Sequence, residues 1–341
     1  MHEFAGTMAA RATRSASSRR QSSPLSDNKR HEILHSMLGI VSLSDEDMSQ
    51  SESPGASSDD ASQCLLLALS HDELGVIVDG LADPLQPVVA VALSSTCKGL
   101  RTPLRAALEV LQQRHERAVA LCQRMGTSCT ALRDAEELLW CDKYLTRDEI
   151  PTLGMILRTN GLHKLRTLAL NGNIFGDVGV RSLCEQLGRD AAPRLSSLCL
   201  GGIGLGPAGA AALAATLRTI PKLEELTLAA NQIGLQGVVA LAPVLRKLPA
   251  LKRLDLGEAE IGDDDVEALL INLGKDDFKA LQKLYLDGNE LTDKTCHNLI
   301  AALKAGALPA LEELHHPEAD AISEHASEEA LWALNAALHQ H

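Results

Sequence analysis

The sequence predicts an α/β fold: a curved solenoid with parallel strands on its concave face and helices on its convex face. Two observations carry this prediction. From Ala135 onward a leucine pattern returns about every 30 residues, and each copy passes from strand spacing to helical spacing. Before the repeats, residues 64–125 have a helical pattern, with Pro84, Pro87 and Pro103 as helix boundaries within it. We therefore expect a small all-α segment and a disordered N-terminal tail to precede the solenoid.

The repeats occupy residues 135–320, and the stretch LRTLALNGNIFGD shows their pattern clearly. The copies start at Ala135, Leu165, Leu195, Leu223, Leu251, Leu281 and Leu311, and the last one is degenerate. Their spacing takes two values, a shorter one for both intervals between Leu195 and Leu251 and a slightly longer one elsewhere. A single strand–helix unit cannot bury its own leucines, so neighbouring units must stack into one continuous core.

The template LxxLxLxxN resembles the leucine-rich repeat, and the two spacings resemble its ribonuclease-inhibitor-like subclass. The resemblance implies a helix in every repeat, behind a strand whose leucines point inward. Three copies have asparagine at the turn, where we expect it to satisfy backbone groups: Asn173, Asn231 and Asn289. Three others depart from the template, and we expect irregular turns there: Lys143, Ile203 and Ala259.

The segment 1–60 contains few apolar side chains, which predicts a disordered tail. It is rich in serine and arginine up to Arg30, and the part from His31 to Asp60 is acidic, without lysine or arginine. An organellar transit peptide is the alternative interpretation, although Glu3 and the lack of an amphipathic helix speak against it. At the other end, residues 321–341 are expected to form a capping helix.

Within residues 64–125, the stretch Leu69–Leu104 resembles an F-box. The matching positions proposed for docking are Leu69, Glu73, Leu74, Ile77, Leu81, Leu93 and Cys97. Ser70 replaces the usual proline, and Leu100 stands near the expected tryptophan. The resemblance implies docking on the small adaptor subunit of a cullin-type ubiquitin ligase. The alternative is a helical cap that shields the open edge of the first repeat.

Several classes of function are disfavoured by the sequence. A net charge of −13 argues against nucleic-acid binding, and no apolar run reaches the ~20 residues of a membrane span. The eight cysteines form no CxxC pair, and no catalytic or metal-binding motif was found. GLGPAG matches a dinucleotide motif but coincides with the glycines of the repeat. We expect no catalysis, cofactor or metal, and a cytoplasmic or nuclear location.

Function is therefore predicted on the concave strand surface, where residues that flank the inward leucines would meet a protein partner. The candidates are Thr167, Asn171, Glu225, Thr227, Arg253, Asp255, Lys283, Tyr285 and Asp287. Arg253 and Tyr285 lead this set, because arginine and aromatic side chains dominate binding hot spots. The leading hypothesis is a substrate-binding F-box-like/leucine-rich-repeat adaptor of a ubiquitin ligase. A plain leucine-rich scaffold and a GTPase-activating protein are the alternatives, the latter because one such family uses this repeat subclass.

Overall fold

The computed structural model describes residues 83–88, 98–159, 162–187, 192–274, 276–315 and 326–339, and the single positions 74, 77, 90 and 92. The predicted disordered tail, residues 1–60, lies outside the described residues. So do five of the F-box-like positions: Leu69, Glu73, Leu81, Leu93 and Cys97.

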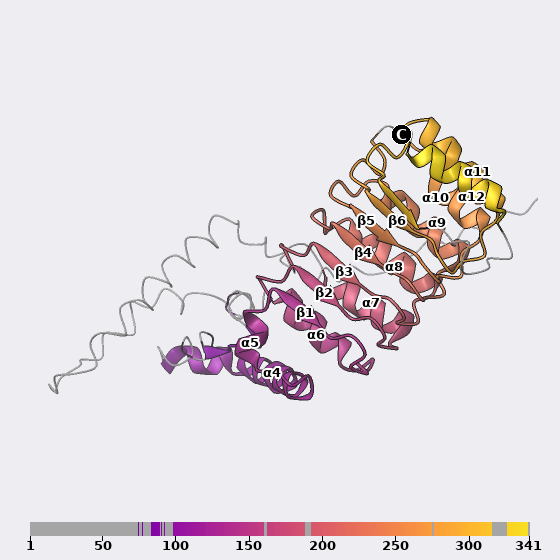
Figure 1. Cartoon of the computed structure of the whole chain (residues 1–341). Coiled ribbons are helices and arrows are strands. Elements are labelled where there is room, and N and C mark those ends of the chain that lie inside the picture. Colours follow the sequence, from indigo (N-terminus) through magenta and orange to yellow (C-terminus); the bar gives the residue numbers. More distant parts are fainter. Residues whose placement is uncertain are drawn as a thin grey trace, which may run out of the picture. The chain divides into compact units, whose positions relative to one another are not determined.

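The described residues contain one parallel sheet of seven strands, ordered as in the sequence, and Figure 1 shows β1 to β6 side by side. The strands are β1 Glu137–Leu139, β2 Thr167–Ala169, β3 Ser197–Cys199, β4 Glu225–Thr227, β5 Arg253–Asp255, β6 Lys283–Tyr285 and β7 Glu313–His315. Their register pairs the central leucines directly, as Leu168 with Leu198 and Leu226 with Leu254. The predicted parallel α/β fold is thereby confirmed.

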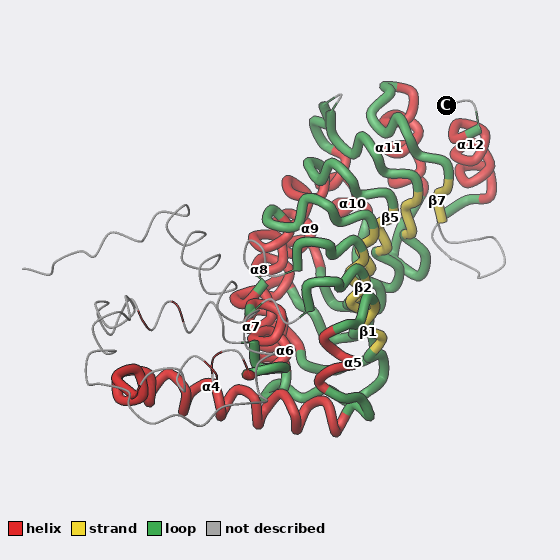
Figure 2. Tube along the Cα trace, turned by 90° about the vertical axis from the view of Figure 1, so that its left-hand side faces the viewer, coloured by secondary structure: helices red, strands yellow, loops and turns green. Residues whose placement is uncertain are grey.

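A helix follows almost every strand and packs on one side of the sheet (Figure 2). The repeat helices are α6 Ile150–Arg158, α7 Gly176–Gln186, α8 Pro207–Leu217, α9 Gly234–Leu245, α10 Asp263–Leu270 and α11 Asp293–Lys304. Adjacent strands are ~4.8 Å apart, whereas packed helices need ~8–10 Å between their axes. The strand side of the stack is consequently its inner side.

The core lies between the strands and the helices and is built mainly from leucine. In the second repeat Leu165, Leu168 and Leu170 are all fully buried, and Leu183 closes the layer from α7. The same positions are buried in the next four repeats, so the core runs without interruption along them. Each fully buried leucine stabilises the folded state by roughly 1.5–3 kcal/mol. This burial requires neighbouring repeats to stack, because one repeat cannot bury its own leucines.

The turn asparagines bond the backbone of two consecutive repeats. Asn231 Oδ1 accepts hydrogen bonds from the amides of Ile203 (3.1 Å) and Leu205 (2.9 Å), both in the preceding repeat. Its Nδ2 donates to the carbonyls of Leu200 (2.8 Å) and Leu228 (2.9 Å). The other two asparagines bridge to the preceding turn in a similar way: Asn173 and Asn289. The expected role of these side chains is confirmed.

In each turn that lacks asparagine, backbone groups are hydrogen-bonded by the asparagine side chain of the next repeat. They also differ in backbone conformation, because the residue after the missing asparagine has a positive φ. These residues are Tyr144 (53°), Gly204 (75°) and Glu260 (52°). A left-handed conformation is unfavourable for tyrosine and glutamate, so it raises the conformational free energy of the folded chain at these two residues. The irregularity expected at these turns is confirmed.

Each end of the repeat stack is covered by helices. At the start, α4 Lys98–Arg124 and α5 Cys129–Arg133 precede β1, and α4 contacts α6 (Figure 2). At the end, α12 Glu328–Leu338 packs against α11 and buries Leu334 and Leu338. Both ends therefore shield leucines that the terminal repeats could not cover alone.

Candidate functional site

The candidate site is the strand face, defined as the surface formed by the two outer residues of each three-residue strand. Because the central leucine of each strand points into the core, its two neighbours point away from it. The register aligns them into two rows across the sheet. The first row is Glu137, Thr167, Ser197, Glu225, Arg253, Lys283 and Glu313; the second is Leu139, Ala169, Cys199, Thr227, Asp255, Tyr285 and His315.

The part of the strand face from β2 to β4 carries small side chains and little charge. Thr167 and Thr227 are half-buried, and Ser197 donates a hydrogen bond of 3.3 Å to the exposed carboxylate of Glu225. Asn171 lies just after β2, where its Oδ1 accepts from the Gly201 amide at 2.7 Å. This part of the face offers a partner few charged groups. The Asn171 side chain is bonded to the backbone of the next repeat.

The most closely connected cluster of candidate side chains lies on β5 and β6. The guanidinium carbon of Arg253 stands 4.6 Å from the centre of the Tyr285 ring, within the range of a cation–π interaction. One guanidinium nitrogen also lies 3.9 Å from the carboxylate of Asp255. The two leading candidates from the sequence are thus brought into contact, and the stack holds both side chains in one geometry.

Glu313 on β7 joins this cluster and continues it along the face. Its carboxylate accepts a hydrogen bond from the Tyr285 hydroxyl at 3.2 Å and forms an ion pair with Lys283. That bond and the negative charge raise the pKa of Lys283. Burial raises the pKa of Tyr285, opposed by the Arg253 charge and supported by Glu313. At neutral pH the cluster therefore presents a protonated lysine and a neutral phenol.

The two remaining candidates on this side are Asp255, in the second row, and Asp287, just after β6. Asp255 accepts a hydrogen bond of 3.1 Å from the Gly257 amide, which ties its carboxylate to the turn after β5. Asp287 follows β6 with an exposed side chain, while its carbonyl accepts from the Glu258 amide at 2.8 Å. Asp287 is the acid of this pair whose side chain is open to a partner.

The sequence does not point to Glu313, because the repeat at Leu311 reads as a degenerate copy. The structure gives this repeat a strand in full register, with Leu284 paired to Leu314 and Tyr285 to His315. The regular spacing from Leu281 to Leu311 was the signal that could have placed Glu313 on the face.

At the glycine-rich start of α8, a side chain of the protein itself bonds the backbone amide that a phosphate could otherwise bind. The Gly206 amide donates to Asp177 Oδ1 at 2.6 Å, so a carboxylate occupies the position that a phosphate would need. A Cβ atom on Gly209 would lie 2.5 Å from the same oxygen. These glycines allow close packing of α7 and α8, as the repeat register indicates.

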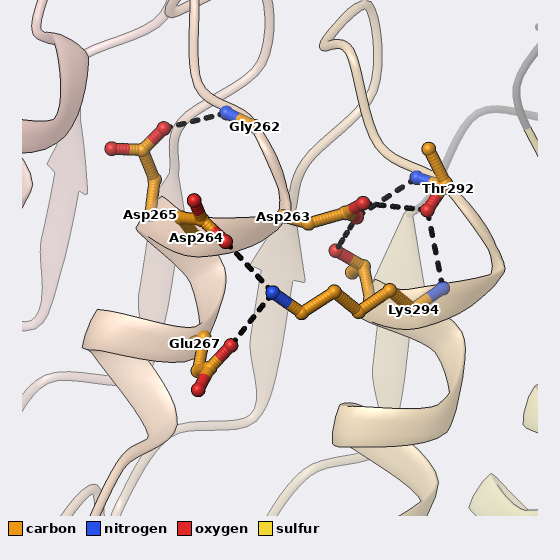
Figure 3. A network of polar contacts seen from close by, with 8 residues as sticks. Gly262, Asp263, Asp264, Asp265, Glu267, Thr292 and Lys294 are labelled. Atoms are coloured by element: carbon orange, nitrogen blue, oxygen red, sulfur yellow. Dashed lines mark hydrogen bonds and ion pairs between the residues drawn. The ribbon is translucent and has the colours of Figure 1, made fainter.

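The acidic cluster at the start of α10 is also engaged in local contacts, which Figure 3 shows. Asp263 accepts from the amide and hydroxyl of Thr292, Asp265 from the Gly262 amide, and Asp264 pairs with Lys294. Among the residues described, no group of three or more His, Cys, Asp or Glu side chains is arranged to hold a metal ion. The cluster joins α10 to α11.

Two of the F-box-like positions are described, and they differ in burial. Leu74 is 3% exposed and belongs to the interior, whereas Ile77, one helical turn later, is half-buried. Of this pair, Ile77 is the side chain that a partner could reach. Within the described part of the chain, no helix combines the length and apolar character needed to cross a membrane.

Comparison with known proteins bears on the repeats. Three segments match the family model described as a leucine rich repeat: residues 161–184, 219–242 and 247–270. A search of curated proteins found no match to the chain. The matched segments cover β2 with most of α7, β4 with most of α9, and β5 with α10. With the seven parallel strands in register, these matches support a leucine-rich repeat protein.

Proposed function

We propose that this protein is a non-catalytic interaction module that binds a protein partner on the strand face, over β5 to β7. The stack of Arg253 on Tyr285 carries the proposal. Leucine-rich repeats suggest a protein-interaction module, and arginine and aromatic side chains supply most of the energy of typical protein interfaces. Here both stand on neighbouring strands of a continuous sheet.

The arrangement suits binding because little ordering is left to occur when a partner arrives. Strand backbones hold the Cα atoms, the cation–π contact orients the ring, and Glu313 holds the phenol and Lys283. A preorganised cluster loses less conformational entropy on association than free surface side chains do. Lys283 and Asp287 at its margin supply charges of both signs, which favour a partner with a mixed polar surface.

The test is affinity capture from cell extract with the full chain, comparing wild type with the double variant Arg253→Ala/Tyr285→Ala. Loss of a partner that wild type recovers reproducibly is the expected result. The matched control is Arg218→Ala, an exposed arginine at the end of α8 on the helix side. Partners kept by the double variant but lost by the control would place binding on the helices and reject the proposal.

The ligase-adaptor role is the finer form of this proposal. It is supported by the F-box-like pattern of Leu69–Leu104 and by the partial exposure of Ile77 next to the buried Leu74. In this role the strand face would bind the substrate and the helical segment would bind the adaptor subunit of the ligase.

The variant Ile77→Glu distinguishes docking from capping when two readouts are taken together. Under docking, the adaptor subunit no longer co-purifies while the melting temperature of the repeats barely changes. Under capping, no adaptor is recovered even by wild type, and the substitution destabilises the first repeat around Leu138 and Trp140. Wild-type protein that recovers no adaptor at micromolar concentration would reduce the function to that of a plain scaffold.

A further inference from the structure

We propose a second binding site, separate from the strand face: a cleft between α4 and α6 that takes an acidic peptide segment of a partner protein. The cleft has a volume of about 690 Å³. We call it the arginine cleft, after the four arginines that line it: Arg114, Arg117, Arg124 and Arg158.

The cleft arises from the helical spacing on its two walls. On α4, Arg114, Arg117, Leu121 and Arg124 recur at intervals of three and four residues, so they share one face. α6 and the residues before it supply the other wall, which ends in Arg158. Residues from two separate parts of the sequence are thus gathered into one basic surface.

The charge of the cleft is opposite to that of the protein. Four guanidinium groups face two carboxylates, Asp148 and Glu149, although the whole chain has a net charge of −13. Glu149 is already committed, because it pairs with Arg124 and accepts hydrogen bonds of 2.9 and 2.8 Å from the Thr146 amide and hydroxyl. The cleft is therefore left with a positive excess.

Two of its arginines are available to a ligand. Arg117 and Arg158 are exposed, and neither makes a side-chain hydrogen bond or ion pair with any residue that the structure describes. They lie on opposite walls of the cleft. A guanidinium presents paired N–H donors that match a carboxylate, so an acidic side chain can be bound from either side.

Size and composition select a peptide over other anions. A single small anion would leave most of a cavity of 690 Å³ unfilled, whereas the apolar Leu121 and Met155 in the lining can contact aliphatic parts of a longer ligand. A nucleic acid would bring many phosphates close to a chain of charge −13, which opposes its binding. Acidic side chains alternating with apolar ones fit both features of the cleft.

The test uses the full chain and a fluorescein-labelled peptide of alternating glutamate and leucine, followed by fluorescence polarisation. The double variant Arg117→Gln/Arg158→Gln should weaken binding at least about tenfold, since it removes two charge-assisted contacts. The matched control Arg181→Gln/Arg218→Gln removes the same charge from two exposed positions, one on α7 and one just after α8. It should change the affinity less than about twofold, because charge-assisted contacts act at short range.

Four results would overturn the proposal, and one further variant separates this site from the strand face. Equal weakening by both double variants would mean non-specific attraction, and release of the peptide by equimolar inorganic phosphate would mean a small-anion site. A single-stranded RNA oligonucleotide that binds more tightly than the peptide would assign the cleft to nucleic acid. Peptide binding seen only after deletion of residues 1–60 would mean that the chain's own acidic segment competes for the cleft. Binding retained by Tyr285→Ala separates this site from the strand face.

Discussion

The buried side-chain amide of Asn231 stabilises two turns of this fold. Asn231 is 2% exposed, and its side chain satisfies two amides of the preceding turn and carbonyls of both turns. All of these hydrogen bonds are buried, so removal of the side chain takes away the partner that the protein supplies to each backbone group. The cost of removal is therefore set by unmet backbone bonds more than by lost contact area.

We expect Asn231→Ala to lower the free energy of unfolding by about 2–4 kcal/mol, because it leaves several buried backbone groups without partners. Urea denaturation monitored by circular dichroism measures this. Gln232→Ala is the control, since Gln232 is exposed and bonds to the exposed Glu260 side chain. It should cost under about 0.5 kcal/mol. Similar losses for both variants would contradict the role assigned to the asparagine.

The burial of alternate strand residues gives a second expectation at the same scale. Leu228 is fully buried, so Leu228→Ala should cost about 2–5 kcal/mol. Thr227→Ala, one residue earlier on the strand face, should cost under about 1 kcal/mol. The same denaturation experiment compares the two. Equal costs would show that the strand register differs from the one described.

At the scale of the helices, an aspartate near the start of one helix bonds the start of the next. Asp177 accepts from Gly206, Asp263 from Thr292, and Asp293 from the Ser327 amide at 2.6 Å. A carboxylate is favoured there by the positive end of both helix dipoles. These bonds fix the spacing of neighbouring helices on the side away from the strand face.

Asp263 makes this linkage dependent on pH. Burial raises its pKa, but the bonds from Thr292 and Thr295 outweigh that effect and hold the pKa below the ordinary 3.8. Since the folded state prefers the ionised form, its contribution is complete above pH 3.8 and is lost as the pH falls through the folded pKa. We expect Asp263→Asn to cost about 1 kcal/mol at pH 7 and progressively less below about pH 4.

Thermal unfolding of wild type and Asp263→Asn between pH 7 and pH 3 measures this convergence. Asp264→Asn is the control, because Asp264 is largely exposed and pairs with the exposed Lys294. It should change the melting temperature little at pH 7. A constant gap between wild type and Asp263→Asn down to pH 3 would show that the side chain acts by shape and not by charge.

The elements differ in how far the sequence could predict them. The leucine period revealed the strands and helices, since each copy repeats the burial of its neighbour, as Leu168 and Leu198 do. The repeat pattern could place Arg253 and Tyr285 on the strand face, but it could not predict their contact, which depends on the conformations of the two side chains. The arginine cleft could not be found in this way, because it depends on how α4 packs against α6, and no repeat relates the two helices. Glu313 was missed because its repeat departs from the template after Leu314.

At the scale of the whole molecule, each repeat is stabilised by contacts with its immediate neighbours only. Deletion of residues 326–341 removes α12, which packs against α11 and buries Leu334 and Leu338. It also removes Ser327, the partner of Asp293. We expect hydrogen exchange to accelerate in α11 and β7 while β2 to β4 keep their protection, because interactions in a repeat stack are local.

Hydrogen–deuterium exchange with mass spectrometry resolves these segments. The Leu228→Ala variant serves as the comparison, since its lesion lies in the middle of the stack. Uniform loss of protection after the deletion would show that the chain unfolds as one cooperative unit.

The asparagines in alternate repeats also define the smallest piece by which such a protein can be lengthened or shortened. Because each asparagine bonds the turn before it, a turn without asparagine depends on the repeat that follows. Excision of the single repeat that contains Asn231 would leave the turns at Ile203 and Ala259 adjacent, and the first of them would have no donor or acceptor from its neighbour. Excision or duplication of two repeats, residues 195–250, keeps every such turn beside an asparagine. For both gene duplication and protein engineering, the modular unit of this chain is a pair of repeats.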